Sequence, residues 1–412
     1  MTREKPLVRT HGEDANIVIA IDSFKGSLSS IEAGRAAAEG IRRVFPGARI
    51  RVCPLADGGE GTVEALTGGM GGSFHSVPVT GPFGKPIACT YGIIRERSLA
   101  VIEAAGAAGL TLQRKEELDP MRASSYGLGE VIRDAVSNGC REFIVGIGGS
   151  ATNDGGVGML QALGYSFLDE KGEQIPHGAK GLEALREITD EDVLPELKDC
   201  VFHIACDVGN VLCGENGCSA VYGPQKGATA EMIEQMDGWL RSYAALAKKK
   251  YPKADPEHPG CGAAGGLGFA FLTFTNATLE PGAAIVLRET GLETWIQKAD
   301  IVLTGEGRLD GQTVYGKAPI AVARCAKRYG KPVLALAGSV RRDASECNKH
   351  GMDAFFPILR EVITLEEALD AKEAKKNMSD TAEQVFRLIG AVTGGNGESH
   401  APECLRQASM NS

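Results

Sequence analysis

Residues 304–319, TGEGRLDGQTVYGKAP, bring two carboxylates, an arginine and a lysine together in a glycine-rich stretch. From Gly311 to Lys317 the stretch satisfies the GxxxxGK spacing of a nucleotide phosphate loop, but Ala318 follows where that loop has a hydroxyl for magnesium. Pro319 suits the first position of a helix, which leaves Lys317 outside the helix, whereas a phosphate loop holds its lysine in the first turn. The match to a phosphate loop is therefore poor.

The acids beside this lysine indicate a different chemistry. Glu306 and Asp310 add two negative charges to the same loop. Carboxylates repel phosphates unless a divalent cation lies between them or one carboxylate accepts a proton from a substrate hydroxyl. A glycine-rich loop with a lysine and two acids favours phosphoryl transfer over simple phosphate binding, with a polar surface loop as the alternative.

A second glycine-rich loop, GIGGSATNDGG at 146–156, follows an apolar run that predicts a strand. Gly146, Gly148 and Ala151 fit the dinucleotide pattern G-x-G-x-x-[GA], and Asp169 lies near the distance expected of a ribose partner, so a dehydrogenase is one interpretation. The pattern lies in mid-chain, however, and a dehydrogenase usually opens its dinucleotide domain with it. A tight structural turn would explain the glycines, but not the polar run Ser150, Thr152, Asn153 and Asp154.

Two lysines lie in loops that suit anion binding. Lys25, in DSFKGSLS (22–29), comes just before a helix start marked by Ser29 and Glu32, a capping box whose free N–H groups and dipole attract anions. Lys226 lies between glycines in GPQKGAT (223–229) and can reach a phosphate or a carboxylate.

The segments around these loops predict the fold class, an α/β protein of two domains. Apolar runs at 16–22, 48–56, 299–304, 332–338 and 353–359 alternate with amphipathic helices, which predicts a Rossmann-like doubly wound parallel sheet built from both ends of the chain. The middle of the chain predicts an inserted α/β domain with a mixed sheet. The expected boundaries are 1–72 and 288–395 for the discontinuous Rossmann-like domain, 73–287 for the inserted domain and 396–412 for a mobile tail.

Ligands of open α/β sheets bind outside the carboxyl ends of the strands. The loops after the predicted strands are 22–29, 56–62, 146–156, 206–210 and 304–313, and all five mix glycine with a carboxylate. We therefore expect them to converge on one site.

Bulk composition excludes several classes of protein. The 412 residues carry a net charge of −9 without a basic cluster beyond AKKK at 247–250, which argues against a nucleic-acid partner. The 11 cysteines form no C-x-x-C pair, and the chain has neither a signal peptide nor a long apolar run. These features predict a cytoplasmic protein with reduced thiols and no membrane contact. The oligomeric state stays open, with a homodimer as one option.

Seven stretches together resemble, in this order, the motifs of the bacterial glycerate kinase family. They are AIDSFKGSLSSIEA, PLADGGEGTVEAL, GIGGSATNDGGVGML, ACDVGN, GPQKGAT, GAAGGLGF and TGEGRLDGQTVYGKAP, spread over residues 16–390. The resemblance implies ATP- and magnesium-dependent phosphorylation of D-glycerate in organic acid catabolism, to 2-phosphoglycerate with 3-phosphoglycerate not excluded. One departure is visible: Gly209 and Val211 stand where the family has a polar residue and a proline, while Asp207 and Asn210 remain.

The roles that we expect follow from this resemblance and from the chemistry of phosphoryl transfer, in which the protein supplies positioning and charge. Lys25 and the helix start at 27–29 hold an anionic group, either the glycerate carboxylate or an ATP phosphate. Asp57 and Asp207 bind Mg²⁺ or orient the glycerate hydroxyls, with Asp154 as a third metal ligand. Asp310 accepts the hydroxyl proton. The further expected binding and charge-orienting residues are Ser23, Gly58, Gly148, Gly149, Ser150, Thr152, Asn153, Asn210, Lys226, Glu306, Arg308 and Lys317.

Three other functions fit parts of the pattern. A kinase of another small hydroxy acid would use the same scaffold and loops. A dehydrogenase would need a nicotinamide cofactor and no ATP. A non-catalytic sensor would bind glycerate and transfer nothing, which the density of acids in five loops disfavours.

Overall fold

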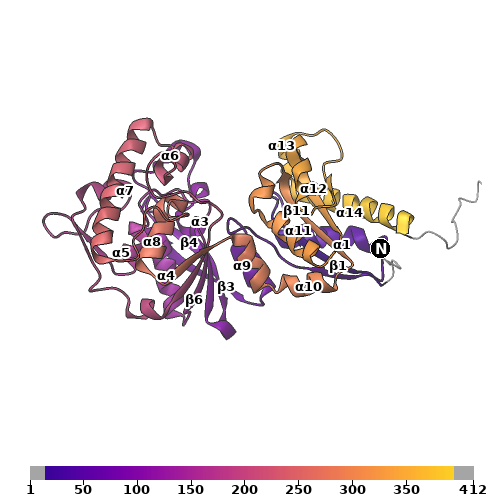
Figure 1. The fold of residues 1–412 in the computed structure, drawn as a ribbon, viewed down its shortest axis with the longest axis horizontal. Coiled ribbons are helices and arrows are strands. Elements are labelled where there is room, and N and C mark those ends of the chain that lie inside the picture. The colour runs from indigo at the N-terminus through magenta and orange to yellow at the C-terminus, as the bar shows by residue number, and fades with distance from the viewer. Residues whose placement is uncertain (1–13, 394–412) are drawn as a thin grey trace, which may run out of the picture.

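The computed structural model describes residues 14–393, so the predicted tail at 396–412 lies outside the described residues. The chain forms two lobes, each built around its own sheet (Figure 1). None of the described helices is long and apolar enough to cross a membrane. The cysteines in the described part of the chain are all free thiols.

The first lobe contains a five-stranded, fully parallel sheet built from both ends of the chain. Its strand order is β13 (Ala354–Pro357), β12 (Val333–Val340), β11 (Ile301–Leu309), β1 (Asn16–Ile21) and β2 (Arg49–Val52). Parallel neighbours need crossover connections, and helices supply them here. The predicted doubly wound sheet is thereby confirmed.

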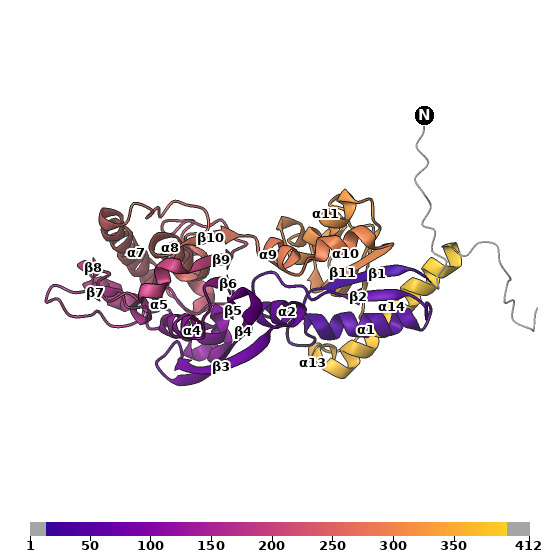
Figure 2. The same ribbon diagram turned by 90° about the horizontal axis from the view of Figure 1, so that it is seen from below.

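Alternate residues of β1 explain why helices cover both faces of this sheet. Val18 and Ala20 pack toward α10 (Leu292–Lys298) and α11 (Ala318–Arg328). Ile17, Ile19 and Ile21 pack toward α1 (Ser30–Arg42) and α14 (Ala371–Thr393). Because successive side chains of a strand point to opposite faces, one apolar run supports two helical layers. Figure 2 shows α1 and α14 below the sheet and α10 and α11 above it.

The second lobe contains a six-stranded mixed sheet, as the sequence predicts. Its order is β10 (Ala277–Glu280), β9 (Val201–Ala205), β6 (Glu142–Gly146), β5 (Leu99–Glu103), β4 (Pro86–Ile94) and β3 (Ser73–Thr80). Strands β3, β4 and β5 are antiparallel neighbours, whereas β5, β6, β9 and β10 run parallel. The main helices are α4 (Tyr126–Ser137), α7 (Ala230–Lys250) and α8 (Leu267–Phe274), and the shorter elements are α3 (Ala104–Ala108), α5 (Val157–Ala162), α6 (Cys218–Tyr222) and the hairpin of β7 (Ser166–Leu168) and β8 (Glu187–Thr189). The short helices α2 (Thr62–Gly69) and α9 (Gly282–Glu289) lie where the chain passes between the lobes, and α12 (Glu346–Lys349) packs in the first lobe.

The lobes share an apolar core. Leu55 and Leu66 of the first lobe belong to the same buried cluster as Leu99, Ile144 and Ala205 of the second. The backbone also packs closely where the lobes meet: a Cβ on Gly58 would lie 2.5 Å from the Cβ of Ala205. The two sheets support the predicted division of the chain, and the boundaries at 72/73 and 287/288 stay a prediction.

Three element boundaries differ from the sequence-based ones, each for a local reason. β2 ends at Val52 rather than 56, before Pro54, which has no N–H to donate to a ladder. β11 runs on to Leu309, so that Glu306 and Arg308 lie in a strand and not in a loop. The predicted helix at 364–391 is two helices, α13 (Leu365–Leu369) and α14, because the Asp370 carboxylate accepts from the N–H groups of the first α14 residues, Lys372 and Glu373.

Candidate active site

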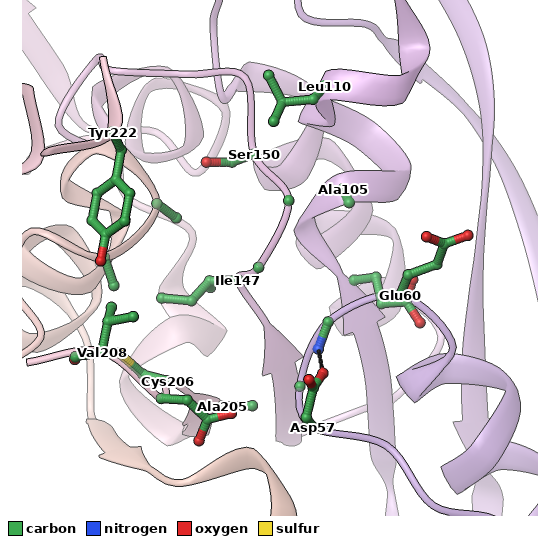
Figure 3. Close-up of a pocket in the computed structure, with 18 of the residues that line it drawn as sticks. Asp57, Glu60, Ala105, Leu110, Ile147, Ser150, Ala205, Cys206, Val208 and Tyr222 are labelled. Atoms are coloured by element: carbon green, nitrogen blue, oxygen red, sulfur yellow. Dashed lines mark hydrogen bonds between the residues drawn. The ribbon is translucent and has the colours of Figure 1, made fainter. Parts of the chain in front are cut away.

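A cavity of about 590 Å³ lies where the strand-following loops of both lobes meet. Such a volume is typical of a small-molecule site. The first lobe contributes loops after β1 and β2, and the second contributes loops after β6 and β9 (Figure 3). Eight of the predicted site residues line the cavity: Lys25, Asp57, Gly58, Gly148, Gly149, Ser150, Asp207 and Lys226.

The loop that carries Lys25 is fixed by the start of α1. The Ser29 hydroxyl accepts from the Glu32 N–H at 3.4 Å, and a Glu32 carboxylate oxygen accepts from the Ser29 N–H at 3.0 Å, which is the predicted capping box. The Phe24 N–H donates to the Leu28 carbonyl and tightens the loop. Lys25 is exposed at the edge of the cavity, and together with Ser23 it also lines an adjoining groove of about 440 Å³.

Asp57 and Asp207 approach the cavity from opposite lobes. Asp57 accepts from the N–H of Gly59 at 3.0 Å, and Asp207 accepts from the N–H of Gly282 at 3.0 Å. Asp207 is in contact with solvent but stands between the protein walls of the cleft, and this desolvation raises the pKa of its carboxyl to about 6, with the Asp57 charge adding to the effect.

Asp22, which the sequence analysis did not select, lies near Asp57. It is the first residue after β1, only 7 % exposed, and its carboxylate accepts from the Ser23 N–H at 2.7 Å. Burial, with smaller contributions from the nearby charges of Asp57 and Glu306, raises its pKa to about 8. An aspartate directly after a buried apolar strand is the sequence signal that could have identified it.

The carboxylates of this region fit a bound magnesium ion. Asp57 repels both Asp22 and Asp207, and a divalent cation would relieve that repulsion. Within residues 14–393 there is no group of three or more His, Cys, Asp or Glu that could hold a metal on its own. Mg²⁺ commonly binds through one or two carboxylates together with substrate phosphates and water, which matches this arrangement.

The glycine-rich loop at 146–156 presents one polar side chain to the cavity. Ser150 is 4 % exposed and lines the cavity, and its hydroxyl has no hydrogen-bond partner among the described residues. Thr152 and Asn153 are fully buried behind it. The Asn153 amide donates to the Ser219 hydroxyl at 2.8 Å, and neither residue lines the cavity.

Lys226 is a buried cation in the cavity wall. It is 2 % exposed, and its Nζ donates to the carbonyl of Thr152 at 2.6 Å. Burial lowers the pKa of its ammonium to about 8, because desolvation penalises the charged form. An anion bound in the cavity would restore the charged form.

Asp154 lies away from the cavity and is fully buried. Its carboxylate accepts from the Ser125 N–H and hydroxyl, both at 2.8 Å, from the Gly156 N–H at 3.1 Å and from the Gly158 N–H at 3.3 Å. These donors lie at the first turns of α4 and α5, where helix dipoles favour a negative charge. The contacts support a structural role, so we leave Asp154 out of the proposed magnesium site.

Asn210 also makes structural contacts and does not line the cavity. Its side-chain oxygen accepts from the Tyr222 hydroxyl at 2.6 Å, and its amide donates to the Asn216 carbonyl at 3.0 Å. At Gly209, one of the two departures from the family pattern, an added Cβ would meet nothing within 4 Å. The loop therefore has room for a side chain there.

The residues of 304–319 form their own buried polar cluster. Glu306 accepts from the Thr313 hydroxyl at 2.5 Å and from Lys317 Nζ at 3.3 Å, and burial raises its pKa. Asp310 accepts from the Gln312 N–H at 3.0 Å and pairs with Arg308 at 3.2 Å. None of these side chains lines the large cavity.

The position of this cluster nevertheless connects it to the Lys25 loop. Gly307 lies against that loop, since a Cβ there would be 3.5 Å from the Cα of Phe24. Lys317 is the N-cap of α11 and Pro319 lies in the first turn, so the lysine stands outside the helix as expected. The stretch thus lacks the phosphate-loop geometry, in which the lysine lies inside the first turn.

The dinucleotide pattern finds no support in the structure. Asp169 lies in a turn after β7 and accepts from the N–H groups of Lys171 and Glu173. Its carboxylate therefore stabilises the turn, whereas a ribose partner would face the glycine-rich loop.

Comparisons with known proteins agree with the sequence motifs. Residues 17–390 match the model of the Glycerate kinase family. The chain is 44% identical over 380 residues to a glycerate kinase of Halalkalibacterium halodurans, covering 92% of this chain and 98% of that protein. It is 46% identical over 352 residues to the glycerate 2-kinase of Escherichia coli, covering 85% of this chain and 92% of that protein.

A solved structure shows the same fold. The crystal structure of putative glycerate kinase 2 from Salmonella typhimurium superimposes with a TM-score of 0.84 at 45% identity, covering 92% of this chain and 100% of that one. A family match over most of the chain and relatives of this identity establish its membership. The chain belongs to the glycerate kinase family.

Proposed function

We propose that the protein is an ATP- and magnesium-dependent kinase that phosphorylates D-glycerate to 2-phosphoglycerate. The observation that carries this proposal is the cavity between the lobes, which combines a glycine-rich loop, two lysines and two aspartates from loops far apart in the sequence. An enzyme of phosphoryl transfer must supply anion-binding groups, a magnesium site and close positioning of its two substrates.

The second lobe provides the groups that suit the ATP phosphates. The backbone at Gly148 and Gly149 borders the cavity, the Ser150 hydroxyl is free to donate, and Lys226 supplies a positive charge from the wall. A buried ammonium interacts more strongly with a phosphate than an exposed one does, because less water screens it.

Asp57 and Asp207 would hold Mg²⁺ between the lobes, where its charge would neutralise the phosphate oxygens during transfer. The two carboxylates come from different lobes, and each is oriented by one backbone N–H, from Gly59 and Gly282 respectively. Their placement leaves the remaining positions of a magnesium ion to phosphate and water.

The first lobe would hold the acceptor. Lys25 would bind the glycerate carboxylate at the edge of the cavity, and Ser23 lines the adjoining groove beside it. Asp310 would accept the proton of the attacking hydroxyl, while Glu306, Arg308 and Lys317 balance charge around it. The position of this cluster against the Lys25 loop supports the assignment.

Phosphorus NMR of the product made from ATP, Mg²⁺ and D-glycerate tests the proposal directly. We expect loss of the ATP γ signal and a phosphomonoester coupled to the proton on C2. A phosphomonoester coupled to the two protons on C3 would identify 3-phosphoglycerate instead. If D-glycerate gives no product while another small hydroxy acid in an ADP-coupled panel does, the substrate assignment is wrong.

Cytoplasmic localisation and assembly as a homodimer belong to the proposal as well. Light scattering after gel filtration measures the oligomeric state, and fractionation of cells measures the localisation.

A further inference from the structure

We propose that the adenine ring of ATP binds in an apolar slot on the second-lobe side of the cavity, against Tyr222 and Ala264, with Gln225 hydrogen-bonding to its polar edge. The inference rests on the proposed function, because it takes ATP as the phosphate donor. It adds the recognition of the base, which neither the family motifs nor the carboxylates explain.

Several apolar side chains gather at one end of the cavity. Ile147, Cys206, Val208, Tyr222 and Ala264 line it together on the second-lobe side. Figure 3 shows the labelled members of this set on one side of the loop that carries Ser150, and Asp57 and Glu60 on the other. An adenine base needs a flat apolar surface, whereas its triphosphate needs cations and N–H groups, which Lys226 and the backbone at Gly148 and Gly149 offer in the same cavity.

Tyr222 provides a rigid aromatic face. Its hydroxyl donates to Asn210 Oδ1 at 2.6 Å, and the Asn210 amide is itself held by the Asn216 carbonyl at 3.0 Å. The ring is half-buried and lines the cavity. Aromatic rings whose orientation is fixed in this way stack on bases at little entropic cost. This contact also gives Asn210 a part in binding, through the tyrosine that it orients.

The backbone at Ala264 gives an independent sign of function. Ala264 adopts a left-handed conformation, with φ 54° and ψ 41°, which favours glycine. The next two residues, Gly265 and Gly266, also have positive φ and are glycines. Of these three consecutive positions, only the one that lines the cavity carries a methyl group. Strained conformations persist where the side chain serves a ligand, and here the methyl would pack on the base.

Gln225 supplies a donor and an acceptor at the same end of the slot. It is exposed, lines the cavity and makes no side-chain hydrogen bond to any residue in 14–393. It precedes Lys226 in the 3₁₀ helix Pro224–Lys226, so the group for the base and the cation for the phosphates are neighbours in the chain. A primary amide pairs with the donor and acceptor of the adenine edge, and guanine presents a different pattern.

The test compares Ala264→Gly, Gln225→Ala and Tyr222→Phe with the control Leu112→Ala. Leu112 lies in the 3₁₀ helix Leu110–Leu112, and Figure 3 shows Leu110 across the Ser150 loop from Tyr222. We expect Ala264→Gly to raise KM for ATP about fourfold through loss of one methyl contact. The same variant should keep or raise Tm, since glycine adopts this conformation without strain. A merely structural alanine would not combine weaker ATP binding with unchanged or higher stability.

The other variants test the polar edge and the ring. Gln225→Ala should raise KM for ATP about three- to tenfold and leave KM for GTP unchanged, which lowers the preference for ATP. Tyr222→Phe keeps the ring but loses the Asn210 contact, so a smaller rise than for Tyr222→Ala is expected. All variants should keep the wild-type KM for D-glycerate, as should Leu112→Ala for both substrates.

Two results would overturn the inference. One is an unchanged KM for ATP in both Ala264→Gly and Gln225→Ala. If KM for ATP then rose in Leu112→Ala, the base would bind beside Leu112 instead. The other is an equal change for ATP and GTP in Gln225→Ala. The increase of Tm on adding ADP with Mg²⁺, measured on the same variants, tests the slot without turnover. If the wild-type protein shows no kinase activity, the proposed function is wrong. If ADP with Mg²⁺ raises Tm equally in the wild type and in all the variants, the slot is wrong.

Discussion

Replacing Asp154 should reduce stability and leave the magnesium requirement unchanged. In Asp154→Ala four donors, the Ser125 N–H and hydroxyl and the N–H groups of Gly156 and Gly158, lose their acceptor in a fully buried place. Each buried donor left unsatisfied costs about 1–3 kcal/mol. The donors share one acceptor and relax together, so we expect about 4 kcal/mol in all, at the upper end of single substitutions.

Asp154→Asn gives a graded comparison. Oδ2 of Asp154 accepts three of the four hydrogen bonds and Oδ1 accepts the one from Gly156. An amide whose oxygen takes the place of Oδ2 therefore loses the bond from Gly156 and turns an NH₂ group toward that donor, at a cost of about 2 kcal/mol. Burial of the Asp154 charge is the largest cause of its raised pKa. Asp154→Asn removes this buried charge and its desolvation cost, which offsets part of the stability lost with the hydrogen bonds.

Asp57→Asn is the matched control at the cavity. Its carboxylate is partly exposed and accepts one described hydrogen bond, from Gly59, so its loss should cost about 1 kcal/mol or less. The same change removes a proposed magnesium ligand and should raise the Mg²⁺ concentration for half-maximal rate at least about tenfold. Urea unfolding measures the stability, and an ADP-coupled assay titrated with MgCl₂ measures the requirement. Wild-type stability with a tenfold higher Mg²⁺ requirement in Asp154→Asn would refute the structural role and restore the metal assignment.

Three further substitutions test the rest of the site. Asp310→Asn keeps the shape of the side chain and removes its basicity, so kcat should fall about 10²- to 10⁴-fold, and a fall of less than tenfold would contradict the base assignment. Lys25→Met should raise KM for glycerate or for ATP, and unchanged values for both would remove Lys25 from the site. Asp207, with its pKa raised to about 6, should lose its affinity for Mg²⁺ as pH falls through 6, which gives an acid limb in kcat/KM that Asp207→Asn removes. The raised pKa also links Asp207 to folding. The protonated carboxyl stabilises the folded protein fully below pH 3.8, and this contribution is lost as pH rises through 6. At pH 8 the wild-type protein carries a charged, desolvated carboxylate, so Asp207→Asn should be more stable than wild type there.

The sequence predicts those parts of the fold that depend on local patterns. The capping box of Ser29 and Glu32 and the apolar run of β1 are such features, and both are confirmed. The loops after β1, β2, β6 and β9 meet at one cavity because strand ends of α/β sheets gather there.

The parts that the sequence did not predict depend on distant neighbours. Asp154 carries the chemistry of a metal ligand, and the structural role that we propose for it depends in large part on Ser125, which lies 29 positions away in the chain. The position of Asp22 after a buried strand is visible in the sequence, but its nearness to Asp57, which comes from another strand-following loop, is not. The sequence predicted a loop at Glu306, whereas β11 extends to Leu309. The extension comes from pairing with β12, a distant segment, and local composition does not encode that pairing.

The buried cluster common to the two lobes bears on how such a chain can evolve. Leu55 and Leu66 pack against the side of the second lobe that carries Leu99 and Ile144. Excising the second lobe as a unit would therefore expose apolar surface on the part that is left, at about 25 cal/mol for each Å². The second lobe therefore cannot be exchanged for an unrelated domain without changing the contact surface of the first lobe as well. Recombination would have to replace both sides of this contact at once, so the two lobes should be inherited together.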